Sequence, residues 1–278
     1  MNQELEIKYR NLQSILRDLG SVVIGFSGGV DSTLLLKTAV DVLGMNAIAV
    51  IGKSETYPAQ EYQEAIRLAQ TIGAQYMEVR TEETDNIKFK ENPVDRCYYC
   101  KTELFGKLHD IAGLRGFKWV ADGSITDDLT DFRPGAKAKK EQNVRSPLLE
   151  AGMSKEDVRE LSKHLNLSTW DKASFACLSS RFPYGFGISK EALKKVDAAE
   201  TILRNLGFHY FRVRQHDENT ARIEVRTDEI QRFANDQFRT TVVDQLKQIG
   251  FTYITLDLQG YRTGSMNETL PESVRRNS

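Results

Sequence analysis

The stretch SVVIGFSGGVDSTLLLKTAVDVLG, residues 21–44, joins an apolar run to a helical pattern through a glycine-rich turn. The run at 21–26 predicts a buried strand, and the segment 31–44 predicts a helix that ends at its glycine. Between them, Gly28 and Gly29 let the backbone turn tightly and bring its N–H groups close to a ligand. The helix N-terminus favours an anion, because its first N–H groups are unpaired and its dipole is positive there.

The turn itself, FSGGVDST at 26–33, carries hydroxyl groups and one acid but no lysine. It is therefore not a Walker A phosphate loop, whose pattern ends in lysine and a hydroxyl residue. Asp31 is a poor ligand for phosphate but a suitable partner for Mg²⁺ or an amide. The candidate anion-binding residues are Ser27, Gly28, Gly29, Val30, Asp31, Ser32 and Thr33. On the pattern alone, a capped turn that binds nothing stays open as the alternative.

The alternation of apolar runs and helical patterns continues along the N-terminal part of the chain. Strands are predicted at 46–52, 74–81 and 118–124, and helices at 5–19, 58–73, 100–113 and 154–167. Buried strands that alternate with capped helices indicate βαβ units and a parallel sheet. We therefore expect an α/β domain with a doubly wound parallel sheet over residues 1–180.

The pattern changes in the C-terminal part. A predicted helix at 189–208 precedes two strands of alternating character at 209–217 and 220–227, then a helix at 228–251 and a strand at 252–260. This order predicts a smaller α+β domain over residues 181–278.

Composition narrows the class of protein. The 278 residues are 40% hydrophobic and 28% charged, with a net charge of −1. Mean hydropathy is −0.45. With so small a net charge, no overall electrostatic attraction favours binding to a nucleic acid or an acidic membrane. No apolar run is long enough to span a bilayer. The N-terminal residues resemble neither a signal peptide nor a transit peptide. Three cysteines without a secretory signal argue against a disulfide framework, so we expect a cytoplasmic protein.

The three cysteines are Cys97 and Cys100, in CYYC, and the distant Cys177, in SFACLSSR. Four interpretations of these cysteines stay open: residues that fill gaps in the core, zinc ligands, a redox pair, or ligands of an iron–sulfur cluster. Zinc usually needs four ligands, and none of the four histidines lies at zinc-finger spacing from the pair. Three thiolates hold three irons of a 4Fe-4S cube and leave the fourth open.

Several of these stretches carry a family resemblance. SGGVDS after the first strand resembles the PP-loop of the N-type ATP pyrophosphatases, which split ATP between its α- and β-phosphates and adenylate a substrate oxygen. Over nearly its whole length the chain is similar to the LarE family of sulfur transferases, which act in making the nickel-pincer cofactor of lactate racemase. The matching stretches are SGGVDST, CYYCK, ADGSITDD, DFRPGAKA, SSRFPYG, FRVRQHDENTARIE and YITLDLQGYRTGSMN.

The resemblance implies an ATP-dependent enzyme with a defined reaction. It adenylates a carboxylate of pyridinium-3,5-biscarboxylic acid mononucleotide and replaces AMP by sulfide, which gives a thiocarboxylate. One LarE subtype gives up the sulfur of a single cysteine, which corresponds to Cys177 here, and works once. The other subtype binds a 4Fe-4S cluster through three cysteines. Cys97, Cys100 and Cys177 match this second subtype. The implied cofactors are ATP, Mg²⁺ and the 4Fe-4S cluster.

The resemblance also selects site residues. Arg212 and Arg214 are two apart on a predicted strand and share one face, which suits an anionic substrate. A solvated strand face is the alternative. The loop at 133–140 adds Arg133 and three lysines, Lys137, Lys139 and Lys140. Candidate substrate-binding residues are Ser180, Arg181, Arg212, Arg214 and Glu224. Candidate catalytic residues are Cys177, Asp31, Lys101 and Glu200, and the ATP-binding set is Ser27 to Thr33.

Two other functions stay open from the sequence. Some tRNA-thiolating enzymes combine a PP-loop with a C-x-x-C pair, but the net charge is −1 and no separate RNA-binding module is visible. A non-catalytic nucleotide-binding or redox-sensing protein would bind ATP without releasing pyrophosphate. We expect a homo-oligomer whose partners are the small-molecule substrate and a sulfide source, with no nucleic acid and no membrane.

Overall fold

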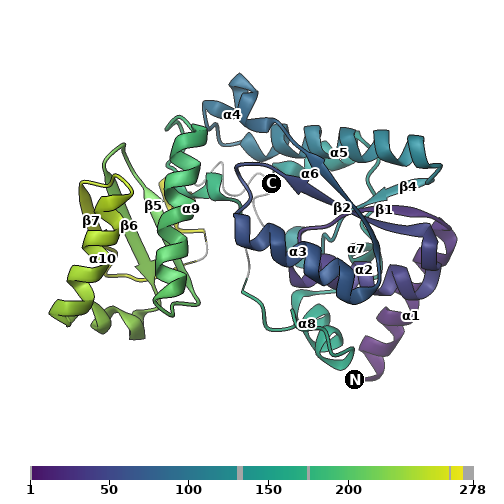
Figure 1. Cartoon of the computed structure of the whole chain (residues 1–278). Helices are drawn as coiled ribbons and strands as arrows, with labels where there is room; N and C mark the ends of the chain where they lie inside the picture. The colour runs from purple at the N-terminus through teal and green to yellow at the C-terminus, as the bar shows by residue number, and fades with distance from the viewer. Residues whose placement is uncertain (1, 130–133, 174–175, 263, 272–278) are drawn as a thin grey trace. The chain divides into compact units, whose positions relative to one another are not determined.

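The structure, a computed structural model, describes residues 2–129, 134–173, 176–262 and 264–271 (Figure 1). The chain forms two compact units. The first unit holds the described residues up to Glu83 and from Asp95 to residue 173. The second unit holds Thr84–Val94 and the described residues from Ala176 onward. Because Thr84–Val94 joins the second unit, the units do not follow a single boundary in the sequence. The domain ranges 1–180 and 181–278 stay a prediction.

The first unit contains a parallel sheet of four strands in the order β3-β2-β1-β4. The strands are β1 Val22–Gly25, β2 Ala47–Lys53, β3 Gln75–Arg80 and β4 Trp119–Ala121. The helices are α1 Gln3–Leu19, α2 Val30–Leu43, α3 Ala59–Ile72, α5 Arg96–Arg115, α6 Gly135–Glu141, α7 Pro147–Glu150 and α8 Lys155–His164. This architecture confirms the predicted α/β class with a parallel sheet.

Alternate residues of β1 explain why helices cover both faces of the sheet. Val22 and Ile24 belong to a core that includes α1, α2 and α8, whereas Val23 belongs to a second core beneath α5 and α6. Successive side chains of a strand point to opposite faces, so an uninterrupted apolar run requires cover on both sides. Figure 1 shows α1, α2 and α3 on one side of the sheet and α5 and α6 on the other.

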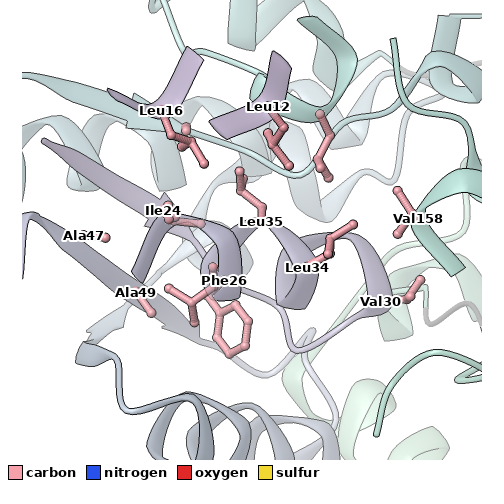
Figure 2. Close-up of a cluster of buried hydrophobic side chains, with 14 of the residues drawn as sticks. Leu12, Leu16, Ile24, Phe26, Val30, Leu34, Leu35, Ala47, Ala49 and Val158 are labelled. Atoms are coloured by element: carbon pink, nitrogen blue, oxygen red, sulfur yellow. The ribbon is translucent and has the colours of Figure 1, made fainter. Parts of the chain in front are cut away.

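Helix α2 lies at the centre of the larger core. Its Leu34 and Leu35 are fully buried, as are Leu12 and Leu16 of α1 and Ile24 of β1. Figure 2 shows these side chains gathered between α1, α2 and the sheet, with Val158 of α8 beside Leu34. A helix buried on most of its surface cannot shift without opening cavities, which fixes the direction in which its N-terminus points.

The second unit has a three-stranded sheet in the order β5-β6-β7. Strands β5 Phe211–Gln215 and β6 Thr220–Val225 are antiparallel, and β7 Tyr253–Leu256 is parallel to β6. Helices α9 Lys190–Asn205 and α10 Asp236–Gln248 cover one face, where Val213 and Ile223 are buried. The short helix α4 Ile87–Lys90 is tied to this unit by the N–H of Ile188, which donates to the carbonyl of Lys90 at 2.8 Å.

Two expectations about helices were wrong. The segment 228–251 is not one helix, because the extended backbone of Asn235 separates the 3₁₀ segment η5 Thr227–Ala234 from α10. The Asn235 side chain accepts the N–H of Phe238 at 2.9 Å, the usual way in which asparagine starts a helix. Helix α5 begins at Arg96 rather than near residue 100, so the CYYC stretch lies inside its first turns and does not precede it.

None of the helices in the described part of the chain combines the length and the apolar character that crossing a membrane requires.

The central position of β1 predicts a large difference between two isoleucines. Ile24 is 0% exposed, whereas Ile7 of α1 is 54% exposed. Ile24→Ala should lower the free energy of unfolding by roughly 2–5 kcal/mol, and Ile7→Ala should change it by less than about 0.5 kcal/mol. Urea unfolding followed by circular dichroism measures both. Similar losses for the two variants would contradict the placement of β1 in the core.

Candidate functional site

The glycine-rich turn lies at the carboxyl edge of the parallel sheet. The N–H of Phe26 still donates to the carbonyl of Val50 in β2 at 2.9 Å, and α2 begins four residues later. Gly29 is the N-cap, with its carbonyl accepting the N–H of Thr33 at 3.0 Å. The Ser27 and Ser32 hydroxyl oxygens lie 3.2 Å apart across the turn. Ligands of open α/β sheets bind at this edge, and the first turn of α2 directs its N–H groups toward it.

Two glycines allow the turn to pack closely against its neighbours. Gly28 has φ +62°, and a Cβ there would lie 3.0 Å from Cα of Ala65 in α3. Gly123, just after β4, lies against the other side, where a Cβ would come within 3.0 Å of the Ser32 nitrogen. A residue with a side chain at either position would displace the loop, because backbone atoms cannot move aside cheaply.

Groups far away in the sequence complete the surroundings of the loop. The Tyr57 hydroxyl donates to the carbonyl of Ser27 at 2.6 Å. Lys172 Nζ donates to the carbonyl of Gly28 at 3.2 Å and lies 2.7 Å from a Glu61 oxygen. Lys155 Nζ lies 2.6 Å and 2.7 Å from the two oxygens of Asp31. The sequence analysis named Asp31 as a site residue. It missed Tyr57, Lys172 and Lys155, because no local pattern marks them as neighbours of the loop.

One acid at the same edge was also missed. Asp122 follows β4, is 9% exposed and accepts the hydroxyl groups of Ser124 and Ser146, both at 2.7 Å. Lys139 Nζ lies 3.9 Å from Asp122. The available signal was an acid near the end of the strand predicted at 118–124, within the quoted ADGSITDD stretch. The expected loop at 133–140 is helical from Gly135 onward, where α6 begins, and its Arg133 lies outside the described residues.

Cys97 and Cys100 are three residues apart in the first turns of α5, so their side chains share one helix face. Both are half-buried, and neither forms a disulfide. Cys100 Sγ lies 4.0 Å from an oxygen of Glu83, which is 2% exposed. That oxygen accepts the Thr56 hydroxyl at 2.7 Å. Lys101, between these cysteines and Phe105, places its Nζ 5.1 Å from the Phe105 ring.

Cys177, in the second unit, has its backbone held by several donors. Its carbonyl accepts the N–H of Ser180 at 3.0 Å, the Ser180 hydroxyl at 2.9 Å and Arg181 Nη1 at 3.2 Å. Arg181 Nη1 also donates to the carbonyl of Ala176 at 2.9 Å. The turn that carries Cys177 is therefore fixed by a guanidinium group.

That guanidinium forms a buried bidentate pair. Arg181 Nε and Nη2 donate to the two oxygens of Glu200 at 2.8 Å and 2.9 Å, and Glu200 also accepts the N–H of Val213 at 3.1 Å. Arg181 is 0% exposed and Glu200 is 3% exposed. Burial favours the neutral form of Glu200, but the charge of Arg181 outweighs it and holds the pKa of the carboxyl below its ordinary value.

A second buried carboxylate joins the arginines of β5 and β6. Glu224, which is 0% exposed, accepts Arg214 at 2.9 Å, Arg222 at 2.8 Å and the Ser265 hydroxyl at 3.1 Å. Arg214 Nη1 also donates to the carbonyl of Ser180 at 2.9 Å. This side of the strands is a packed ionic network, not the solvated face that was the alternative.

Arg212 lies on the same strand face with a different environment. Its Nη1 donates to its neighbour's carbonyl, that of Phe211, at 2.7 Å, and its guanidinium carbon lies 5.0 Å from the centre of the Tyr261 ring. Burial and the nearby charge of Arg181 lower the pKa of Arg212. A buried cation that other cations destabilise gains from the arrival of an anion.

The predicted site residues thus fall into two sets. Asp31 and the rest of the loop share the first unit with Cys97, Cys100 and Lys101, and the second unit brings together Cys177, Ser180, Arg181, Glu200, Arg212, Arg214 and Glu224. Arg181 pairs with Glu200, and Glu224 pairs with two arginines of β5 and β6. The roles of all three residues toward a substrate stay predictions. Among the residues that the structure describes, no group of three or more His, Cys, Asp or Glu side chains is arranged to hold a metal ion.

Comparisons with known proteins match both the loop and the whole chain. The NAD synthase family model matches residues 4–96. The chain is 45% identical over 266 residues to an uncharacterized protein of Synechocystis, covering 96% of this chain and 99% of that protein. It is 42% identical over 270 residues to the pyridinium-3,5-bisthiocarboxylic acid mononucleotide synthase of Lactiplantibacillus plantarum, covering 97% of each. An uncharacterized protein of Methanocaldococcus jannaschii is 30% identical over 242 residues, or 87% of this chain and 91% of that protein.

The buried Arg181–Glu200 pair predicts a strong and pH-dependent loss of stability. Arg181→Met leaves Glu200 charged and unpaired in the core, which should cost roughly 3–5 kcal/mol of the free energy of unfolding at pH 7. Arg226→Met is the matched control, because Arg226 pairs with Asp228 at the surface, where solvent screens the pair, and its stability should stay close to that of the parent. Urea unfolding measures both.

The difference between the parent and Arg181→Met should shrink as the pH falls. In the parent, the lowered pKa of Glu200 contributes stability above the unfolded pKa, about 4.3, and this is lost as the pH falls through the folded pKa. In the variant, desolvation favours the neutral acid, so acid relieves the cost. A difference that stays constant from pH 7 to pH 4 would contradict a buried charge at Glu200.

Proposed function

The chain belongs to the LarE family of PP-loop sulfur transferases, and we propose that it converts pyridinium-3,5-biscarboxylic acid mononucleotide to a thiocarboxylate at the expense of ATP. The observation that carries the proposal is the geometry of the loop at residues 26–33. Its hydroxyl groups, its acid and the first turn of α2 meet at one edge of a parallel sheet. This arrangement suits the release of pyrophosphate, a dianion or trianion that needs N–H donors.

The first step activates a carboxylate. A substrate carboxylate oxygen attacks the α-phosphorus of ATP, an O–P bond forms, and the bond from the α-phosphorus to the bridging oxygen of pyrophosphate breaks. Ser27, Ser32 and the N–H groups at the start of α2 bind the charge that develops on pyrophosphate. Asp31 would hold Mg²⁺, which would neutralise part of that charge. The product is an acyl-adenylate. Activation is required because a free carboxylate has no good leaving group.

The second step transfers sulfur. The sulfur of a hydrosulfide attacks the acyl carbon, a C–S bond forms, the C–O bond to AMP breaks, and the proton of the hydrosulfide goes to solvent. Arg212 and Arg214 bind the anionic groups of the substrate through charge-assisted hydrogen bonds. Arg181 and Glu200 hold the backbone of Cys177 during this step, and Lys101 adds a cation beside Cys100.

Cys97, Cys100 and Cys177 would hold the 4Fe-4S cluster that the three-cysteine subtype uses. Two half-buried thiols on one face of α5 suit two corners of a cube, and the fixed turn at Cys177 offers a third thiolate. When bound, the cluster supplies the sulfide for transfer. We also infer a cytoplasmic homo-oligomer that acts in lactate racemase maturation and receives its sulfide from a separate source.

A turnover assay tests the function directly. Protein loaded with iron and sulfide under anaerobic conditions should release pyrophosphate from MgATP when pyridinium-3,5-biscarboxylic acid mononucleotide is present. The mononucleotide should gain one sulfur and lose one oxygen for each thiolated carboxylate, as read by mass spectrometry. Unfractionated tRNA is the control substrate and should stimulate no pyrophosphate release. Thiolation of tRNA, or ATP binding without pyrophosphate release, would replace this proposal with one of the two other functions.

The cysteines separate the two LarE subtypes. Anaerobic protein should contain about four irons per chain, and Cys97→Ala, Cys100→Ala and Cys177→Ala should each lose most of the iron, because two thiolates hold the cube poorly. Iron analysis and visible absorption measure this. Adenylation, followed as pyrophosphate release, should survive in all three variants. Iron-free protein that needs only Cys177 and converts it to dehydroalanine after one turnover would favour the sacrificial subtype.

A further inference from the structure

The phosphate loop contains an acid at the place where an anion has to bind. Asp31 is the second residue of α2, so its carboxylate lies beside the same N–H groups that favour a phosphate. A carboxylate and a triphosphate repel each other at this range unless a cation lies between or beside them. The loop also lacks the lysine by which Walker A loops bind the β- and γ-phosphates. Positive charge beside Asp31 therefore has to come from a side chain of another part of the fold.

Lys155 provides that charge. Its Nζ lies 2.7 Å and 2.6 Å from the two oxygens of Asp31, although 124 positions separate the residues in the sequence. The backbone beneath it is anchored, because its N–H donates to Asp127 at 2.9 Å and Ser154 caps α8. Both side chains of the pair remain partly open to solvent, Lys155 at 35% and Asp31 at 26%. A bound ligand can therefore reach the ammonium group.

The position of Lys155 does not depend on the ion pair itself. Helix α8 packs on α2, and its Val158 is buried in the same core as Val30 and Leu34 (Figure 2). This apolar contact holds the start of α8 next to the loop. The pair with Asp31 is partly exposed, and such pairs contribute little to the stability of a protein. The ammonium can therefore leave Asp31 for a more highly charged partner at little cost.

Lys172, the second lysine described near the loop, has different partners. Lys172 Nζ binds the carbonyl of Gly28 and a Glu61 oxygen, so it supports the backbone of the turn. Lys155 Nζ instead lies against the carboxylate of Asp31, in the first turn of α2. Of the two, Lys155 is placed to exchange partners when a nucleotide enters.

We propose that Lys155 is the polyphosphate-binding lysine of this ATP site. When MgATP binds, its ammonium moves from Asp31 to oxygens of the β- and γ-phosphates, and Asp31 is released to coordinate Mg²⁺. The same contact then stabilises the negative charge that pyrophosphate gains as the α-phosphorus is attacked. This inference rests on the proposed use of ATP, and it assigns to a distant helix the role that a lysine within the motif has in Walker A loops.

Calorimetric titration of the full chain with MgATP tests the proposal. Lys155→Met should weaken MgATP binding about 10–100-fold, the loss expected for one charge-assisted hydrogen bond. Lys155→Arg should restore part of it. Lys163→Met is the matched control, because Lys163 lies on the same helix but stacks on Trp170, with Nζ 4.8 Å from the ring centre, and should bind as the parent does. AMP, which lacks the β- and γ-phosphates, should bind the parent and Lys155→Met equally.

A double-mutant cycle with Asp31→Asn separates direct from indirect action. If Lys155 contacts phosphate, Lys155→Met should weaken ATP binding, measured without Mg²⁺, in the Asp31→Asn background as well as alone. If Lys155 only neutralises Asp31, the second substitution should have no effect in that background, and the proposal fails. Parental MgATP affinity of Lys155→Met, or an equal loss for AMP, would also overturn it. None of these results bears on sulfur transfer, so tight ATP binding without thiolation would reject the proposed function alone.

Discussion

The burial of α2 between the sheet and helices α1 and α8 is the constraint on which the rest of the first unit depends. Eight of its fourteen residues are buried, including Leu34, Leu35 and Leu36 in succession. A helix enclosed in this way has one orientation, and its N-terminus must open at the carboxyl edge of the sheet. The turn before it has no room for side chains at Gly28, where Ala65 approaches. Apolar packing thus places the unpaired N–H groups at the start of α2 along the carboxyl edge of the sheet.

The second unit relies on buried charge where the first relies on apolar packing. Ion pairs such as Arg181–Glu200 and Arg214–Glu224 are expensive to desolvate, and apolar residues of similar volume often stabilise a fold as well. Their value here is geometric. Arg181 fixes the carbonyl groups of Ala176 and Cys177, and Arg214 fixes that of Ser180. The network thereby sets the backbone on both sides of the cysteine expected to take part in sulfur transfer.

Charge around the turn at residues 26–33 is assembled from separate parts of the chain. Asp31 comes from the motif, Lys155 from α8 and Lys172 from the segment after it, and each lysine forms an ion pair with an acid. An acidic phosphate loop is consistent with the proposed chemistry, because an enzyme that releases pyrophosphate needs a metal ligand as well as donors. In the exchange that we propose for Lys155, one ammonium group pairs first with Asp31 and then with phosphate.

Local patterns in the sequence were enough to predict the strands of the parallel sheet, the helices that alternate with them and the SGGVDS turn. Each of these depends on residues close together in the chain, through side-chain periodicity and the backbone freedom of glycine. Two helix boundaries were nevertheless predicted wrongly. Asn235 divides a helical pattern into two segments, and α5 starts before CYYC. What only the tertiary structure decided are contacts between distant residues. Lys155 and Lys163 look alike as lysines of one helix, yet packing of α8 on α2 directs the first to Asp31 and leaves the second on Trp170. Likewise, Arg181 and Glu200 were named from the sequence as site residues, but no local pattern shows that they are buried against each other. The fold decides this, because the energy of a charge is set by the solvent and the partners around it.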